Sequence, residues 1–308
     1  MKLVFCGTPQ FAVPSLEKLA AAGFDLRLVI TQPDRPQGRG LALAASPVKQ
    51  AAQKLNLPVI QPDKIKKNEE LQQQLAGIAA DAIIVVGYGR IIPPWMLSLP
   101  LLGNINVHAS LLPKYRGAAP IQWAIAHGET VTGVTTMRLD EGLDTGDILL
   151  QREIAVLPED TAVTLAPRLA ALGADLLIET LKGLEQGKIS AAPQDHSRST
   201  LAPILKKEDG LIDFNRTAVE IHNRLRGFKP WPGVYTIFRG KNLKVVDARP
   251  AQGQLSPGEL HVKAGELLVG CGAGTALELI QVQPEGKKAI TAREFISGYR
   301  PKEGERIG

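Results

Sequence analysis

The sequence contains only two cysteines, Cys6 and Cys271, and they form no Cys-x-x-Cys pair. Such scarcity excludes a disulfide framework and a cysteine-based metal site, because each needs several thiols at fixed spacings. Two isolated thiols instead favour a cytoplasmic protein in which both stay reduced. The charge is also modest: a formal net charge of +5 permits a polyanionic partner without requiring one.

Long apolar runs are absent as well. The apolar start of the chain is broken by Gly7-Thr8-Pro9, so it is too short for a signal peptide. No later run approaches the roughly 18 residues that a membrane span requires. We therefore expect no membrane partner, and by default we expect the chain to act as a monomer.

Three catalytic signatures are missing. The turn after the first strand-like stretch lacks Gly-x-Gly-x-x-Gly, which argues against the usual dinucleotide site and hence against a nicotinamide oxidoreductase. The chain has no Gly-x-Ser-x-Gly nucleophile elbow. His and Cys residues nowhere cluster at the spacing of metal ligands, so we expect no metal.

Apolar, strand-like stretches alternate with helical ones through the first half of the chain. Uniformly apolar stretches are typical of strands buried on both faces, so the alternation predicts an α/β fold with a doubly wound, mostly parallel, Rossmann-like sheet. In the last helical stretch Pro167 predicts a kink or a later start, since an interior proline costs about 3 kcal/mol. The expected strands are residues 3–6, 26–30, 81–86, 103–108, 131–139 and 148–154, and the expected helices are residues 15–22, 69–78, 118–126 and 160–186.

The pattern changes near Lys206. Short strand-like runs then follow one another at intervals of roughly 8–12 residues, separated by turns rich in glycine, as in a small barrel or sandwich. A small OB-like β-barrel is the natural candidate. We expect a catalytic domain over residues 1–189, a linker over residues 190–206 and a C-terminal domain over residues 207–308. That last domain has 16 Lys and Arg residues against 12 Asp and Glu, so it supplies most of the basic excess.

Two polar side chains mark the end of the strand over residues 103–108. Asn106 and His108 are two positions apart, so they project from the same face of that strand. They lie at its carboxyl end, where open α/β sheets bind their ligands. The segment Ser110-Leu111-Leu112-Pro113 follows and is apolar enough to be the wall of a pocket. On these residues alone, a core histidine beside a turn is an equal alternative.

A second polar stretch, residues 140–147, contains three aspartates, Asp140, Asp144 and Asp147. Solvated loop acids account for two of them. The order Asn-x-His, Ser-Leu-Leu-Pro and then Asp-x-Gly-x-Asp-Thr-Gly resembles the formyltransferases that use 10-formyltetrahydrofolate.

The resemblance implies 10-formyltetrahydrofolate as co-substrate. It also implies which residues would bind this co-substrate and which would catalyse the transfer. It implies that Asn106, His108 and Asp144 form the catalytic set. The positions that it places at the folate pocket are Tyr88, Ser110, Leu111, Leu112 and Pro113.

Further segments narrow the resemblance to those family members that formylate methionyl initiator tRNA for translation initiation. In Pro33-Asp34-Arg35-Pro36-Gln37-Gly38-Arg39-Gly40, prolines and glycines bar regular structure, and most such loops are merely solvated. The segment nevertheless resembles the loop with which those members engage the acceptor end of the tRNA. The resemblance implies Arg39 first, and Arg35 second, as tRNA contacts.

The C-terminal domain carries the same resemblance in residues 206–214, 230–233 and 283–288. It implies Lys206, Lys287 and Lys288 as phosphate contacts, although all three could be solvated lysines. We expect Trp231, between two prolines, to be a packing anchor rather than a platform for a base.

Formyl transfer from folate to an amine passes through a tetrahedral intermediate with a developing oxyanion and needs no metal. Asn106 would donate to the oxyanion, His108 would donate to it or shuttle protons, and Asp144 would accept the amine proton or hold His108 protonated. One alternative is a folate-dependent formyltransferase that acts on glycinamide ribonucleotide or an amino sugar nucleotide. Another is a non-catalytic tRNA-binding protein, against which the intact catalytic set argues.

Overall fold

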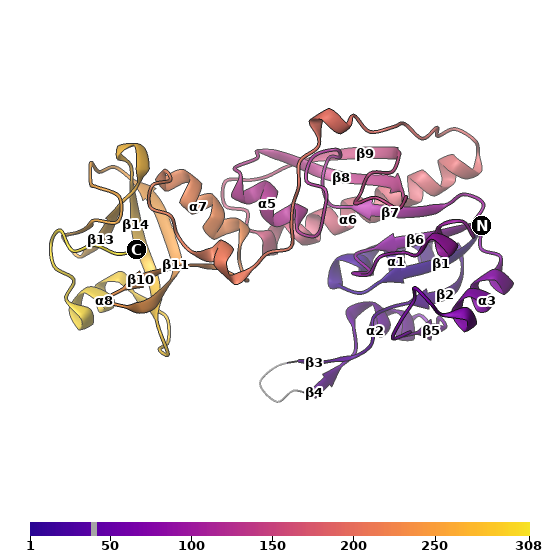
Figure 1. Cartoon of the computed structure of the whole chain (residues 1–308), viewed down its shortest axis with the longest axis horizontal. Helices are drawn as coiled ribbons and strands as arrows, with labels where there is room; N and C mark the ends of the chain where they lie inside the picture. The colour runs from indigo at the N-terminus through magenta and orange to yellow at the C-terminus, as the bar shows by residue number, and fades with distance from the viewer. Residues whose placement is uncertain (38–41) are drawn as a thin grey trace. The chain divides into compact units, whose positions relative to one another are not determined.

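The computed structural model describes residues 1–37 and 42–308, which form two compact units (Figure 1). Unit 1 comprises Met1–Pro120, Val131–Ala155 and Ala166–Ala202. Unit 2 comprises Ile121–Thr130, Val156–Leu165 and Pro203–Gly308. Each unit has a sheet of its own.

The sheet of unit 1 has seven strands in the order β5-β2-β1-β6-β7-β8-β9. Neighbouring strands from β5 to β7 run parallel, and β8 and β9 add an antiparallel edge. The predicted doubly wound, mostly parallel sheet is therefore confirmed. Its strands are β1 (Lys2–Gly7), β2 (Asp25–Ile30), β5 (Val59–Ile60), β6 (Ala82–Val86), β7 (Asn104–His108), β8 (Val131–Arg138) and β9 (Ile148–Ala155).

Helices and short helical turns connect these strands or follow the last of them. α2 begins at Pro47, and the Ser46 hydroxyl oxygen accepts a hydrogen bond from the Lys49 N–H at 3.1 Å, as an N-cap does. The elements are η1 (Gln10–Ala12), α1 (Val13–Ala21), α2 (Pro47–Lys54), α3 (Glu69–Ile78), α4 (Pro94–Leu97), α5 (Pro120–Ala126), α6 (Ala162–Glu185) and η2 (His196–Arg198).

Helix α6 begins at Ala162, close to the predicted residue 160, and continues through Pro167, so of the two predicted consequences of that proline the later start does not occur. Proline has no N–H to donate to the carbonyl four residues earlier, that of Val163. Val163 is 54% exposed, so this turn of the helix lies at the protein surface. No helix in the ranges that the structure describes is both long and apolar enough to cross a membrane.

Strands β1, β6 and β7 form the centre of the core in unit 1. All of β6 and β7, and all of β1 except Lys2, is buried, because the middle strands of such a sheet are covered on both faces. Edge strand β9 instead alternates between buried or half-buried and exposed positions. Cys6 belongs to this core, and it and Cys271 are both buried free thiols, as predicted.

The proline-rich and glycine-rich segment after β2 contains regular structure, contrary to prediction. Strand β3 (Arg35–Gln37) pairs antiparallel with β4 (Ala42–Ala44) in a short hairpin. Proline is tolerated in such a two-stranded edge because there is no further strand to which it would have to donate. Lys49 Nζ lies 2.6 Å from Asp34 Oδ2 at the base of the hairpin. Arg39 lies outside the described residues.

Unit 2 is built on an antiparallel sheet in the order β10-β11-β14-β13-β12, with β15 paired to β14. Buried and half-buried residues alternate along β10, as expected for a sheet with one face on a core. This antiparallel domain agrees with the small OB-like architecture predicted from the turn spacing. Its elements are η3 (Lys207–Gly210), α7 (Ala218–Gly227), β10 (Val234–Phe238), β11 (Lys241–Ala251), β12 (Leu260–Lys263), β13 (Glu266–Gly270), η4 (Gly272–Gly274), β14 (Ala276–Pro284), β15 (Ile290–Thr291) and α8 (Ala292–Tyr299).

Candidate active site

Strand β7 carries the first two candidate residues, between β6 and β8 (Figure 1). Asn106 is 8% exposed and His108 6% exposed, so both polar side chains are almost removed from bulk water. Buried polar groups normally have hydrogen-bond partners. The partners of these two side chains therefore indicate what each one is free to do.

The ring of His108 is oriented by a backbone carbonyl. Its Nε2 lies 2.9 Å from the carbonyl oxygen of Tyr115. Because a carbonyl only accepts, Nε2 must carry the hydrogen in the neutral ring, and Nδ1 then has the lone pair. Nδ1 lies 3.7 Å from Asp144 Oδ2, too far for a hydrogen bond. A proton arriving at Nδ1 would face the carboxylate.

Asp144 comes to this position from the loop between β8 and β9. Its Oδ2 accepts a hydrogen bond from the Gly117 N–H at 2.8 Å, which aims the carboxylate at the His108 ring. Asp140 has a different task, because its carboxylate accepts hydrogen bonds from Gly142 N–H and the Thr145 hydroxyl. Of the three aspartates in the loop, Asp144 is the one beside the imidazole.

The carboxamide of Asn106 is not engaged by the protein. Among the residues that the structure describes, it forms no hydrogen bond to any side chain or backbone group. Asn106 is only 8% exposed and its carboxamide has no partner in the described protein, so its two amide hydrogens are available to a ligand. Within residues 1–37 and 42–308, no three His, Cys, Asp or Glu side chains group as a metal site would require.

Hydrogen bonds to neighbouring parts of the protein fix the segment Ser110–Pro113, which is the predicted pocket wall. The Ser110 hydroxyl, fully buried, donates to the Lys114 carbonyl at 2.6 Å. The Leu112 N–H donates to Thr135 Oγ1 at 3.1 Å, and Gln151 Nε2 donates to the Leu112 carbonyl at 2.9 Å. Ser110 and the Leu112 backbone thus hold the shape of the wall.

The other two wall residues, Leu111 and Pro113, are half-buried. They are the apolar members of the segment that remain open to a ligand.

Tyr88 lies just after β6, in the loop whose contact with the folate pocket stays a prediction. Its ring is 2% exposed and packs in the core of unit 1, and burial raises the pKa of its hydroxyl to about 12. Its carbonyl accepts hydrogen bonds from Thr8 Oγ1 and Gln32 Nε2. Sequence periodicity stops at the end of β6, so it could not indicate into which layer the next aromatic ring turns.

Several contacts that sequence reasoning missed hold the site together. They involve the Tyr115 carbonyl, the Gly117 N–H and Gln194, whose Nε2 donates to the Asp144 carbonyl at 2.9 Å. Two are backbone groups, for which residue type gives no signal. Gln194 stands in a polar stretch that composition cannot distinguish from a linker.

Replacing Gly117 by alanine is expected to destabilise the protein and to break the hydrogen bond from the N–H of residue 117 to the Asp144 carboxylate. Gly117 has φ +119°, and an added Cβ would lie 2.7 Å from the Ala202 carbonyl oxygen. Strain of this kind costs roughly 1–3 kcal/mol, and relieving the clash moves the N–H away from Asp144. Gly103→Ala is the matched control, because Gly103 also has positive φ, +82°, but open space around it. Equal thermal midpoints and turnover for the two variants would contradict the prediction.

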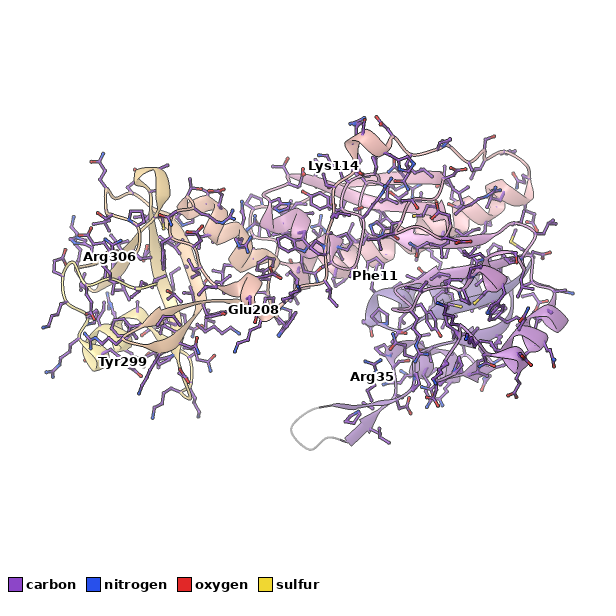
Figure 2. The ribbon with its side chains drawn as sticks, viewed as in Figure 1. Phe11, Arg35, Lys114, Glu208, Tyr299 and Arg306 are labelled. Carbon is purple, nitrogen blue, oxygen red and sulfur yellow. The ribbon has the colours of Figure 1, made fainter. Side chains whose placement is uncertain are left out.

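The candidate tRNA contacts within the described residues are exposed. Arg35 lies on β3 (Figure 2), and its Nη2 donates to Gln32 Oε1 at 2.7 Å. Lys206, Lys287 and Lys288 are exposed, and none forms an ion pair with a residue that the structure describes. Trp231 is 55% exposed, so the prediction that it is a packing anchor is wrong.

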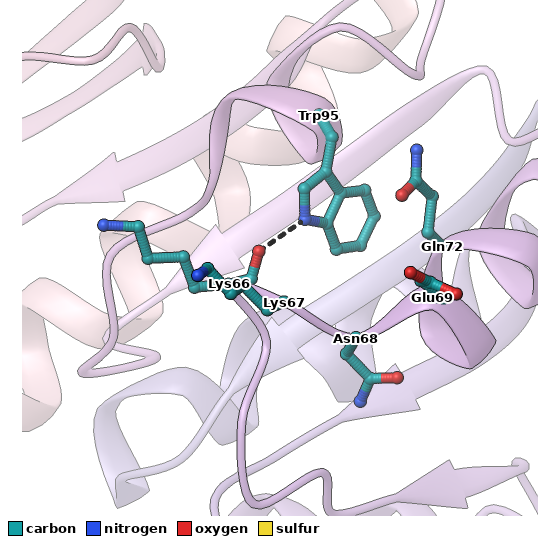
Figure 3. Close-up of a pocket in the computed structure, with 6 residues that line it drawn as sticks. All are labelled: Lys66, Lys67, Asn68, Glu69, Gln72 and Trp95. Atoms are coloured by element: carbon teal, nitrogen blue, oxygen red, sulfur yellow. Dashed lines mark hydrogen bonds between the residues drawn. The ribbon is translucent and has the colours of Figure 1, made fainter.

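A surface hollow of ≈ 510 Å³ lies elsewhere on unit 1 (Figure 3). The Trp95 indole N–H donates to the Lys66 carbonyl at 3.3 Å at its rim. None of the candidate catalytic residues lines it, so the candidate site is defined by the side-chain geometry around His108. The hollow is lined by Lys66, Lys67, Asn68, Glu69, Gln72 and Trp95.

Known proteins are similar to this chain along its whole length. Residues 1–181 match the family model described as Formyl transferase, and residues 204–300 match the one described as Formyl transferase, C-terminal domain. The chain is 67% identical over 308 residues to a methionyl-tRNA formyltransferase of Koribacter versatilis (strain Ellin345), covering 100% of this chain and 99% of that relative. It is 58% identical to a methionyl-tRNA formyltransferase of Acidobacterium capsulatum, covering 100% of both.

A solved structure has a similar fold. It is an N-formyltransferase from Helicobacter canadensis in complex with folinic acid and dTDP-3-aminofucose. The TM-score is 0.68 at 21% identity, over 92% of this chain and 99% of that one.

Proposed function

The chain belongs to the formyltransferase family, and we propose that it transfers the formyl group of 10-formyltetrahydrofolate to the α-amino group of methionyl initiator tRNA. The product is N-formylmethionyl-tRNA for translation initiation. Two methionyl-tRNA formyltransferases match this chain from end to end at 67% and 58% identity. This similarity supports the same substrates here. The observation that carries the chemistry is an unpaired Asn106 carboxamide beside a His108 ring that faces the Asp144 carboxylate.

Asn106 stabilises the oxyanion. When the amine attacks the formyl carbon, negative charge develops on the formyl oxygen, and a pre-positioned N–H donor lowers the energy of that state. Removing one such donor costs about 2.7–4 kcal/mol where it has been measured in another enzyme. The burial of Asn106 supports this role, since a donor acts more strongly away from water.

His108 and Asp144 handle the protons. The attacking amine loses a proton and the departing folate nitrogen gains one, so the site needs a group that accepts and returns a proton. His108 Nδ1 has the free lone pair, and the negative charge of Asp144 stabilises the ring once it is protonated. Direct acceptance of the amine proton by Asp144, through a water molecule, is the other route, and the two differ in which residue is the base.

Exposed basic side chains are the proposed tRNA contacts. Arg35 and Arg39 lie in the segment after β2, and an arginine fork can bond phosphates and stack on bases. Lys206, Lys287 and Lys288 are exposed lysines of unit 2, suited to phosphate contacts. The exposed Trp231 adds an aromatic face on which an unpaired base can stack.

One assay tests the function against its rivals. The enzyme is given labelled 10-formyltetrahydrofolate with methionyl initiator tRNA, free methionine, glycinamide ribonucleotide or an amino sugar nucleotide. We expect label only on the tRNA. Preferential formylation of either small nucleotide would assign the chain to another branch of the family. Tight tRNA binding without transfer to any acceptor would make it a non-catalytic tRNA-binding protein.

Binding of the initiator tRNA is expected to weaken steeply with salt. Each phosphate contact by a lysine or arginine releases counterions, so log K falls with log salt by about 0.7–0.9 per contact. Replacing Lys287 and Lys288 by alanine should reduce that slope by between one and two. The exposed pair Lys66 and Lys67, outside the proposed tRNA set, provides the control. A flat salt dependence, or equal slopes for both double variants, would remove Lys287 and Lys288 from the tRNA site.

The location and the assembly follow from the same proposal. Charged initiator tRNA and reduced folate are both found in the cytoplasm, so the enzyme acts there. The proposed machinery is complete within one chain, which is consistent with a monomer. Sedimentation of the purified protein measures the assembly state directly.

A further inference from the structure

Residues 192–202, which we call the strap, run along the site instead of bridging freely between domains. Ala192 exchanges both backbone hydrogen bonds with Ile148, at 2.9 and 2.8 Å. At the other end of the strap, Arg116 N–H donates to the Thr200 carbonyl at 2.8 Å, and Ala202 N–H donates to the Arg116 carbonyl at 2.7 Å. The strap is thus fastened to the loop after β7 and to the start of β9.

Gln194 is the one polar side chain of the strap that is buried, at 5% exposed. Its Nε2 donates to two carbonyls of the aspartate loop, that of Asp144 at 2.9 Å and that of Gly146 at 2.7 Å. Asp144 has φ +51°, a conformation that residues other than glycine seldom adopt. Such a conformation persists where surrounding contacts hold it, and the Gln194 amide supplies that contact.

Arg116 orients the Gln194 amide. The guanidinium donates to Gln194 Oε1 from both Nε, at 3.1 Å, and Nη2, at 2.6 Å. Its Nη2 also lies 3.1 Å from His196 Nδ1. Because a guanidinium only donates, Oε1 must face Arg116, and the amide hydrogens must face the two loop carbonyls.

The burial of Arg116 needs an explanation other than an ion pair. Its residue is 6% exposed, and within the described part of the chain no carboxylate lies within salt-bridge distance of it. A buried cation that has only neutral acceptors is costly. Two of its three side-chain hydrogen bonds go to the Gln194 amide, which holds the aspartate loop, and the third goes to His196 Nδ1.

The backbone on either side of Arg116 completes the arrangement. Tyr115, before it, provides the carbonyl that orients His108, and Gly117, after it, provides the N–H that orients Asp144. One side chain and two backbone groups of this tripeptide therefore determine how far Asp144 lies from His108.

We infer that Gln194 and Arg116 are positioning residues for formyl transfer, which fix the Asp144 carboxylate at the His108 ring through the Asp144 and Gly146 carbonyls. The inference rests on the proposed function. Neither residue touches the reacting atoms. Misplacing a catalytic group by 1 Å can cost about 10²-fold in rate, so the expected effect is on turnover rather than on substrate affinity.

Two variants of Gln194, one variant of Arg116 and one control test the inference. Gln194→Leu removes every bond of the amide. Gln194→Glu keeps the acceptor for Arg116, and so keeps the buried cation paired, but it replaces the two donors by an oxygen that repels the loop carbonyls. Asp195→Ala changes the neighbouring strap residue, which is exposed and whose carboxylate accepts hydrogen bonds, within the described residues, only from Ser197. Arg116→Lys, which loses the two-pronged contact, should resemble Gln194→Glu.

We expect Gln194→Glu to fold, with kcat lowered by about 10²-fold and KM for both substrates nearly unchanged, while Asp195→Ala keeps wild-type kinetics. In an Asp144→Asn background, Gln194→Glu should lower kcat by no more than about twofold, because residues that act through one group are not additive. Wild-type kcat in a folded Gln194→Glu protein would overturn the inference. A full, multiplicative effect in the Asp144→Asn background would overturn it as well.

A measurement without substrates separates this inference from the proposed function. In protein labelled with ¹⁵N-histidine, the ring signals of His108, assigned with His108→Ala, should shift in Gln194→Glu and stay in place in Asp195→Ala. Unchanged His108 signals in Gln194→Glu would overturn the positioning role. If the wild type failed to formylate any acceptor, the proposed function would fall, and the shift would still decide the role of Gln194.

Discussion

Replacing Asp144 by asparagine is expected to lower kcat by about 10²- to 10⁴-fold, the range that a positioned acid or base contributes, in a protein that stays folded. Asparagine has the same shape, tolerates the left-handed backbone at this position, and can still accept the Gly117 N–H through its carbonyl oxygen. It has no charge to stabilise a protonated His108 and cannot accept a proton. Steady-state kinetics at saturating concentrations of both substrates measure the loss.

Asp147→Asn is the matched control for that experiment. It removes one negative charge from the same loop, and its carboxylate makes no hydrogen bond or ion pair within the described residues. We expect it to keep near-normal turnover. If Asp144→Asn matched this control, Asp144 would have no part in catalysis.

Replacing His108 by alanine is expected to have an effect of similar size on kcat, because it removes the group that shuttles protons beside Asn106. It also removes the hydrogen bond from His108 Nε2 to the Tyr115 carbonyl, and one such bond contributes about 0.5–1.5 kcal/mol to the free energy of unfolding. His108→Gln separates the two consequences, since glutamine can donate to that carbonyl but cannot carry a proton at neutral pH. We expect His108→Gln to recover stability and not activity.

His261 provides the control for His108. It is a histidine of unit 2 that pairs with Glu303. His261→Ala should leave turnover unchanged. The double variant His108→Ala/Asp144→Asn should be about as slow as the slower single variant, because groups that act as a unit are not additive. Losses that multiply would mean that the two residues act independently.

The fold was largely accessible from sequence because its signals are local. Uniform apolar stretches such as residues 82–86 are typical of strands covered on both faces, and the helix predicted over residues 69–78 has the same bounds as α3. The hairpin after β2 was missed because the composition of residues 35–37 and 42–44 does not predict that they pair. The predicted start of α6 near residue 160 is close to the observed Ala162, but the sequence could not indicate whether Pro167 would interrupt the helix.

The candidate site could be predicted from the sequence only in part. Spacing two residues apart on a strand places Asn106 beside His108, whereas the arrival of Asp144 depends on pairing between β7, β8 and β9 across 36 residues of chain. The contacts that hold it there could not be predicted. They come from backbone groups at Tyr115 and Gly117 and from Gln194, a residue in a stretch that reads as a linker.

The most direct measurement is a single-turnover transfer of labelled formyl from 10-formyltetrahydrofolate to methionyl initiator tRNA, with enzyme in excess, for the wild type and for Asn106→Ala. Under these conditions the rate reports chemistry and not product release. We expect the wild type to label the α-amino group of the methionine and Asn106→Ala to do so about 10²- to 10³-fold more slowly, as for loss of one oxyanion donor. No label on the tRNA with the wild type, or equal rates for the two proteins, would contradict the account.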